Sequence, residues 1–409
     1  MNLVIRGGTV VDTEPIGARA ADVLVRDGRV AAVGPDLTAP GAEVIDASGM
    51  LVLPGFVDTH RHTWQAGIRA VGPDISFAGY LDLVLNTLAP RYRPTDVHAG
   101  TLAGALECLD AGITTVVDWC HIQRTPDHTA AALDALRVAG IRAVFGYCVR
   151  NPDVRAARAV RDTTGGLVTM AMAPYGPEIV SEEDALLEWQ VARELDLPVT
   201  VHMGGHGAES AARGMDFLRR NDLLGPRTSF AHGNSYSDDA LREIADSGGT
   251  ISVSPLVEVE LGLGMPVTAR AVAAGVPTGL GADTVVSGPG DMFSLMRTAY
   301  ALARLDTHFT AADALRAATV DGAKAAALDG VGSLKVGNHA DVVLLRTDRP
   351  GVAPVHDPVA SVVLAMDTSA VDTVLVGGRV VKRHGLLRHH DLTALLTTLE
   401  ESASHVTTT

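Results

Sequence analysis

The chain has 409 residues, of which 47% are hydrophobic and 20% are charged, and its formal net charge is −15. This length accommodates a barrel domain of about 250 residues together with a smaller unit. The negative charge argues against a nucleic-acid ligand, because phosphate binding requires a basic surface. No uninterrupted apolar run approaches the roughly 20 residues that span a bilayer, and we expect no membrane association.

Three cysteines, Cys108, Cys120 and Cys148, are too few and too scattered for a disulfide framework. We therefore expect them to be reduced thiols. The first residues, M-N-L-V-I-R-G-G, lack the basic segment and the long apolar run of a secretory signal peptide. Together these features predict a cytoplasmic protein.

The two ends of the chain have a similar β-rich character. Residues 1–53 contain short β-prone runs separated by Gly and Asp turns, including R-D-G-R, a hairpin signal. Residues 333–390 contain similar runs, with strands expected at 340–345, 361–364, 371–376 and 379–382. We predict that the two segments form one discontinuous β-sandwich domain, and that residues 391–409 form a C-terminal helix with a frayed tail.

Residues 54–332 have the pattern of an α/β protein. Short apolar runs alternate there with longer, Ala-rich segments of helical periodicity, which indicates parallel strands joined by helices. Eight such units favour a closed (β/α)8 TIM barrel, and the absence of an early G-x-G-x-x-G motif argues against a dinucleotide-binding sheet. The strands are expected at 55–59, 114–118, 142–147, 168–173, 199–202, 228–232, 250–253 and 278–282.

The first barrel strand ends in a pair of histidines, within the stretch L-V-L-P-G-F-V-D-T-H-R-H-T-W. Side chains at positions i and i+2 of a strand point to the same face, so His60 and His62 present two imidazoles together. Asp58 lies two residues before His60, and we expect it to orient a histidine or the end of the strand. Two neutral imidazoles on a rigid strand are suited to chelating a metal ion.

Three further polar residues directly follow apolar runs, at the ends of strands 5, 6 and 8. They are His202, His232 and Asp283. Any one of them alone would be an ordinary polar residue at a strand end. In a barrel, however, the C-terminal ends of the strands converge on one site, so we expect these side chains to join the two histidines of strand 1.

These motifs resemble the amidohydrolase superfamily, as do the opening L-V-I-R-G-G-T-V-V-D and the closing G-S-L-K-V-G-N-H-A-D-V-V-L-L. The stretch H-R-H-T-W-Q-A-G-I-R-A further resembles the branch that contains triazine hydrolases and cytosine, guanine and adenosine-type deaminases. The resemblance implies that His60, His62, His202 and Asp283 are metal ligands. It also implies that His232, which is not a ligand, polarises the scissile group.

The resemblance also bears on the number of metal ions. Binuclear members place a bridging lysine, cysteine or glutamate at the end of strand 4. Here that segment reads T-M-A-M-A-P-Y-G-P-E, without a lysine, and Glu178 lies beyond the strand. A single divalent ion is therefore favoured, with Zn2+ as the first choice and Fe2+ as the alternative.

One position departs from the pattern of the deaminases. They usually carry a glutamate three residues after the strand-5 histidine, where it transfers protons, and this chain has Gly205. His206 follows it and could be either a proton shuttle or a loop contact. Glu209 is better suited to the start of the next helix, where a negative charge is favourable.

The predicted activity is that of a metal-dependent aminohydrolase acting on a C–N bond of a nucleobase-, pterin- or triazine-like heterocycle. Metal-activated water is the nucleophile, Asp283 takes its proton, His232 supports the developing charge and His206 protonates the leaving group. One alternative is a hydrolase of a cyclic amide or of an amine or halide ring substituent. Another is a non-catalytic scaffold with this fold.

Five residues after strands 1 and 2 are candidates for contact with a flat, small-molecule heterocycle, because aromatic faces stack on rings and amides read their edges. Loop packing is the alternative for each. The edges of the β-domain also favour a homo-oligomer, a dimer or larger. The candidate contacts are Trp64, Gln65, Arg69, Trp119 and His121.

Overall fold

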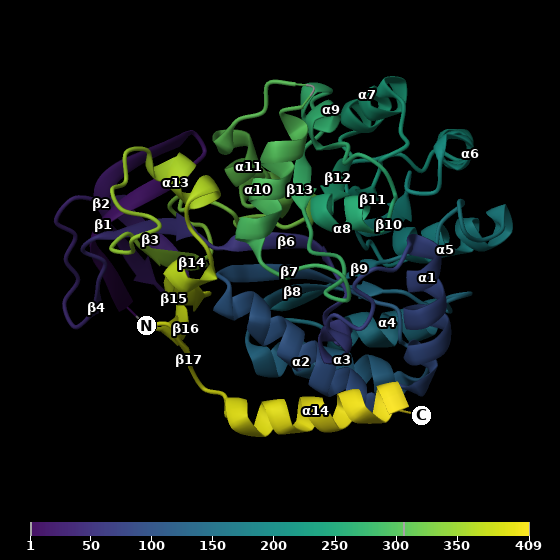
Figure 1. Cartoon of the computed structure of the whole chain (residues 1–409), viewed down its shortest axis with the longest axis horizontal. Helices are drawn as coiled ribbons and strands as arrows, with labels where there is room; N and C mark the ends of the chain where they lie inside the picture. Colours follow the sequence, from purple (N-terminus) through teal and green to yellow (C-terminus); the bar gives the residue numbers. More distant parts are fainter. Residues whose placement is uncertain (1, 306, 409) are drawn as a thin grey trace.

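The computed structural model describes residues 2–305 and 307–408, which form a barrel and a separate sheet beside it (Figure 1). The barrel is closed and has eight parallel strands, which confirms the predicted fold class. Three of the strands have the expected bounds. The barrel strands are β6 (Phe56–Arg61), β7 (Ile113–Cys120), β8 (Arg142–Tyr147), β9 (Val168–Met172), β10 (Val199–Met203), β11 (Thr228–His232), β12 (Thr250–Val253) and β13 (Thr278–Leu280).

The helices that follow these strands begin and end at recognisable signals. Helix α7, for example, starts after Ser237, whose hydroxyl accepts a hydrogen bond from Ala240 N, and ends at Gly248 with φ 76°. The barrel helices are α2 (Pro94–Asp110), α3 (Pro126–Ala139), α4 (Val154–Thr163), α5 (Glu182–Glu194), α6 (Ala208–Arg220), α7 (Asp238–Ser247), α8 (Pro255–Glu260), α9 (Thr268–Ala273), α10 (Met292–Ala303), α11 (Ala311–Ala317) and α12 (Val320–Ala325).

A long helical connection joins the first barrel strand to α2. Its short turns do not follow one helical period, and the sequence did not predict them. Its apolar side chains reach the mouth of the barrel, as described below. The elements are η1 (Thr63–Ile68), α1 (Phe77–Tyr80), η2 (Leu81–Leu88) and η3 (Ala89–Arg91).

Both ends of the chain contribute to the second unit, as predicted. Its nine strands form one mixed sheet, in which β5 pairs in parallel with β1 and antiparallel with β14. The sheet has its own cluster of buried Val, Leu and Ile side chains. The strands are β1 (Asn2–Thr13), β2 (Ile16–Arg26), β3 (Arg29–Gly34), β4 (Glu43–Asp46), β5 (Met50–Pro54), β14 (Val342–Arg346), β15 (Val371–Val376), β16 (Arg379–Arg383) and β17 (Leu386–Leu387).

One strand expected in this unit is instead helical. Residues 361–364 belong to α13 (Pro358–Leu364), and a short turn, η4 (Thr368–Ala370), follows. The apolar run suggested a strand, but Asp357 caps the segment by accepting from Ala360 N, and Pro358 occupies the first turn. A capping Asp followed by Pro is a helix start, and this local signal outweighs the β-branched composition.

The C-terminal tail is also helical, contrary to the frayed end we expected. Helix α14 (Leu392–Thr408) runs to the end of the described residues and lies along α2 (Figure 1). Val406 and Ser402 are buried, and Arg91 donates a hydrogen bond from Nη1 to the carbonyl of Val406 at 3.0 Å. Tertiary packing therefore orders a polar segment whose composition alone indicated fraying.

The three cysteines are buried free thiols. Within residues 2–305 and 307–408, no helix has the length and apolarity required to cross a membrane.

Candidate active site

The closure of the barrel brings the first and last strands together at the site. Asp283 N donates to the carbonyl of His60 at 2.7 Å, and His62 N donates to the carbonyl of Asp283 at 2.8 Å. Gly281 makes this approach possible, because a Cβ there would lie 2.7 Å from the Cβ of His60. The backbone thus positions the strand-1 histidines against the strand-8 aspartate before any side chain interacts.

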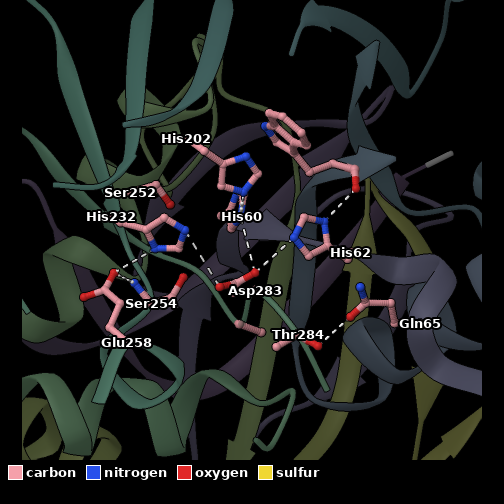
Figure 2. Close-up of polar contacts among 12 residues, drawn as sticks. His60, His62, Gln65, His202, His232, Ser252, Ser254, Glu258, Asp283 and Thr284 are labelled. Atoms are coloured by element: carbon pink, nitrogen blue, oxygen red, sulfur yellow. Dashed lines mark hydrogen bonds and ion pairs between the residues drawn. The ribbon is translucent and has the colours of Figure 1, made fainter. Parts of the chain in front are cut away.

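The four expected ligands converge, as Figure 2 shows. Nε2 of His62 lies 3.0 Å from Oδ1 of Asp283, and Nε2 of His60 lies 3.5 Å from the same oxygen. Nε2 of His202 lies 3.0 Å from Nε2 of His60. Two ligands of one tetrahedral zinc, each about 2.0–2.1 Å from the ion, are separated by about 3.3 Å. These three separations are close to that value. The donor atoms of His60, His62 and His202 all lie within 4.8 Å of one another, as do those of His60, His232 and Asp283.

The protonation of these histidines also suits a metal ion. Burial lowers the pKa of His60 to about 4, and burial together with neighbouring histidines lowers the pKa of His202 well below its ordinary value. Both rings are neutral at pH 7, the form that binds metal. Nδ1 of His62 donates to the carbonyl of Trp119 at 2.7 Å, which leaves the lone pair of Nε2 directed at Asp283. This donor set fits a divalent ion.

A fourth histidine, His232, lies beside this cluster and is held by a buried glutamate. Nδ1 of His232 donates to Glu258 Oε1 at 3.2 Å, and its Nε2 lies 4.0 Å from Oδ2 of Asp283 (Figure 2). Burial lowers the pKa of His232, but the hydrogen bond to Glu258 and the charge of Asp283 outweigh burial and raise it. The ring is thus suited to donating a hydrogen bond from Nε2 to a substrate.

Two residues of the site have left-handed backbone angles that non-glycine residues rarely adopt. They are His232, with φ 83°, and Asp283, with φ 58°. Such angles cost of order 1–3 kcal/mol and persist where the surrounding structure imposes them. His232 is the last residue of β11, and Asp283 lies three residues after the end of β13, so the turn of the backbone directs each side chain toward the barrel axis.

Asp58 supports the strand ends, as expected. Its Oδ1 accepts hydrogen bonds from the backbone nitrogens of His60 at 3.2 Å and Ala282 at 3.1 Å. Its Oδ2 lies 3.5 Å from Nη1 of Arg61, which is also buried. Asp58 therefore links strands 1 and 8 of the barrel immediately beneath the site.

A cavity of about 410 Å3 opens above the cluster, within the range of small-molecule sites. Side chains of the connection after strand 1 form much of its apolar wall, including Phe77, Leu81 and Leu85. Trp119 and His121, two of the predicted substrate contacts, also line it. Burial and the nearby histidines lower the pKa of His121 well below its ordinary value, so this ring is neutral.

The other three predicted contacts do not line the cavity. Trp64 is fully buried and packs edge-on against the ring of Tyr92, with 5.1 Å between centroids. Gln65 is also buried, and its amide bonds to the hydroxyls of Tyr80 and Thr284. The helical turn that follows strand 1 carries these side chains away from the barrel axis and into the core.

The third of these residues, Arg69, lies further along the same connection. Its side chain is 43% exposed and pairs with Glu107 at 2.8 Å. The ion pair holds the guanidinium on the outside of the barrel. Arg69 therefore has a structural partner and no position at the cavity.

His206 lies exposed at the rim of the cavity, with its ring 5.6 Å from that of Phe77. Sequence reasoning assigned no catalytic role to two carboxylates that the structure places at the site, Glu178 and Glu258. Glu258 lies five residues after the end of strand 7, and it reaches the site because α8 begins between them. Glu178 follows strand 4, where it was considered only as a metal bridge.

Comparison with known proteins extends this description. The model of the amidohydrolase family matches residues 51–381. The chain is 28% identical to a 5'-deoxyadenosine deaminase of Methanothermobacter thermautotrophicus, over 99% of each protein. It is 29% identical to a 5-methylthioadenosine/S-adenosylhomocysteine deaminase of Pyrococcus furiosus, over 93% of this chain and 94% of the relative.

Solved structures show the same architecture. An adenosine deaminase from Xanthomonas campestris with bound zinc has a TM-score of 0.92 and 25% identity, covering 100% of this chain and 99% of the other. An atrazine chlorohydrolase from Arthrobacter aurescens complexed with zinc has a TM-score of 0.92 at 22% identity, covering 98% and 100%, and shows the shared fold. The family model matches most of the sequence, including His60, His62, His202 and Asp283, and this match places the chain in the amidohydrolase family.

Proposed function

We propose that the chain is a metal-dependent aminohydrolase that replaces the amino group of a nitrogen heterocycle with oxygen, and that its substrate is a 6-aminopurine nucleoside or a close analogue. The observation that carries this proposal is the convergence of three imidazoles and one carboxylate under a cavity that also holds His232. Deaminases of adenosine-type compounds among the relatives support the choice of substrate class.

The proposed ion is a single Zn2+, with Fe2+ as the alternative, held by His60, His62, His202 and Asp283. The zinc bound to the Xanthomonas relative supports this choice. When bound, the ion lowers the pKa of a water molecule toward neutrality and so makes a nucleophile available. The remaining chemistry belongs to side chains of the chain itself.

Three side chains act on the substrate in this proposal. Asp283 takes a proton from the attacking water and passes it to the leaving amine. His232 donates a hydrogen bond from Nε2 to charge that develops on the substrate, while Glu258 orients the ring and favours its protonated form. Trp119 and His121 contact the heterocycle from the cavity wall. His206, at the rim, is the alternative donor of the proton that the leaving amine takes up.

The test is ammonia release by the zinc-loaded protein from a panel of adenosine, 5'-deoxyadenosine, 5-methylthioadenosine, guanine, cytosine, a pterin and aminotriazines. We expect turnover of at least one member, loss of it after chelation, and recovery with one equivalent of zinc. Silence across the panel, with turnover of cyclic amides or chlorotriazines, would instead establish the alternative hydrolase. Less than a tenth of an equivalent of metal after purification in zinc-containing buffer would favour a scaffold.

We also propose a cytoplasmic location and a homo-oligomer. The three buried thiols support the first, since a reducing compartment keeps cysteines unpaired. Size measurement in solution tests the second, and a monomer at micromolar concentration would contradict it.

A further inference from the structure

Hydrolytic deamination needs two groups that carry protons. Water adds its oxygen to the ring carbon while the adjacent ring nitrogen gains a proton, and the amine later departs as ammonia. Asp283 can move one of these protons, but it is also a proposed metal ligand. A second carrier must therefore reach the ring nitrogen from another part of the cavity wall.

In the part of the chain that the structure describes, two carboxyl groups line the cavity. They are those of Asp283 and Glu178. It comes from the segment between β9 and α5. Its Oε1 accepts a hydrogen bond from Gly204 N at 2.8 Å, two residues after the ligand His202. Its Oε2 is buried and has no hydrogen-bond partner among the described residues. One oxygen is thus anchored and the other is available for a proton.

The surrounding backbone leaves room for this carboxyl group. A Cβ on Gly214 of α6 would lie 3.1 Å from Oε1 of Glu178, and a Cβ on Gly204 would lie 2.7 Å from the Cα of Gly233. Gly205, the next residue, faces His232, because a Cβ there would lie 3.7 Å from atoms of that imidazole. Gly214 therefore leaves space beside the carboxyl group of Glu178, and the turn to which that group is hydrogen-bonded lies against His232.

A buried glutamate on α5 shows what a purely structural carboxylate looks like in this chain. Glu188 accepts from Tyr175 N and Gly176 N, each at 3.0 Å, so both of its oxygens have partners, and it does not line the cavity. Burial raises the pKa of Glu178 and of Glu188 alike to about 7. The two carboxyl groups are therefore alike in burial and in the direction of their pKa shift. Only Glu178 has an oxygen without a hydrogen-bond partner and a position at the cavity.

We infer that Glu178 is the carboxyl group that protonates the ring nitrogen of the substrate and later recovers a proton. As the water oxygen bonds to carbon, Glu178 gives its proton to the ring nitrogen and Asp283 takes one from the water. The C–N bond then breaks, the amine takes the proton of Asp283, and the new hydroxyl gives its proton to Glu178 as the carbonyl forms. Water and amine become carbonyl and ammonia, and both carboxyl groups return to their initial states.

This inference rests on the proposed function, and the test separates the two. Glu178→Gln keeps an oxygen for Gly204 N but cannot carry the proton. On the substrate that the wild-type protein turns over best, we expect kcat to fall at least 100-fold, with KM within threefold and zinc content unchanged. Glu188→Gln, the matched control, should lower kcat less than tenfold.

A Glu178→Gln protein that keeps more than a tenth of wild-type kcat would overturn the inference and leave the proposed function intact. Wild-type protein that is loaded with zinc and releases no ammonia from any heterocycle would overturn both. If the Gln variant fails to fold, Glu178→Ala is assayed with added formate, a small carboxylic acid. A rate that rises with formate supports the inference, and a rate that does not respond contradicts it.

Discussion

The substitution Glu258→Gln isolates the effect of one charge on the site. Glu258 is fully buried and accepts three hydrogen bonds, from Ser254 N at 2.7 Å, His232 Nδ1 at 3.2 Å and Asn234 Nδ2 at 3.0 Å. The oxygen of a glutamine can still serve Ser254 and His232, which both bond to Oε1. We expect the variant to lose about 1 kcal/mol of folding free energy, a melting shift of about 2 °C.

The effect on His232 should be larger than the effect on stability. A hydrogen bond to a charged acceptor contributes about 1.5–3 kcal/mol and a neutral one about 0.5–1.5 kcal/mol, a difference of about 1 pKa unit. Glu258 raises the pKa of His232, so removing its charge lowers that pKa. The His232 ring then loses its proton at a lower pH, so the basic limb of the pH–rate profile should move to lower pH by about one unit.

At a pH above the pKa of His232 in both proteins, this shift alone reduces the protonated fraction of the ring about tenfold. A less fixed orientation of the ring adds to the loss, so we expect kcat to fall about 10- to 100-fold. The assay is the pH dependence of ammonia release, with zinc content and melting temperature measured on the same protein. Glu243→Gln, which removes an exposed partner of Arg219, is the control and should stay within twofold of wild type. An unchanged kcat and basic limb in Glu258→Gln would refute the reasoning.

Asp283→Asn should abolish turnover but leave the fold intact, because an amide accepts no proton; circular dichroism and kinetics together check this, and near-normal kcat would exclude the proposed role. Trp64→Phe should lower stability by about 1–2 kcal/mol without changing KM, whereas Trp119→Phe should change KM because Trp119 lines the cavity. Thermal melts and steady-state kinetics distinguish them, and the reverse pattern would contradict the assignment. His206→Ala should lower kcat, and full activity would remove His206 from the mechanism.

The barrel and the ligand set could be predicted because their signals are periodic and local. An i, i+2 pair at a strand end has one geometric meaning, so His60 and His62 needed only the strand assignment. His202, His232 and Asp283 each lie at the C-terminal end of a buried strand or just beyond it, and closure of a barrel brings such ends together. The β-rich chain ends were predicted for the same reason, although Asp357 and Pro358 turned one expected strand into a helix.

Residues beyond the strand ends were less predictable, because their positions depend on the path of a connection. Trp64 and Gln65 lie only two and three residues after His62, yet a single helical turn directs them into the core. Arg69 instead meets Glu107, 38 residues away in sequence. Proximity in sequence to a ligand is therefore a poor guide to the cavity once the strand has ended.

The two carboxylates that sequence reasoning did not assign show the same dependence on tertiary structure. Glu258 becomes a partner of His232 because α8 begins directly after strand 7 and returns its first turn to Ser254 N. Glu178 reaches the cavity because Gly214 leaves space beside its carboxyl group and Gly204 N donates a hydrogen bond to its Oε1. A proton-transfer group need not occupy a fixed place in the sequence. It needs only a position on the cavity wall, and a chain with Gly205 after strand 5 can supply it from strand 4.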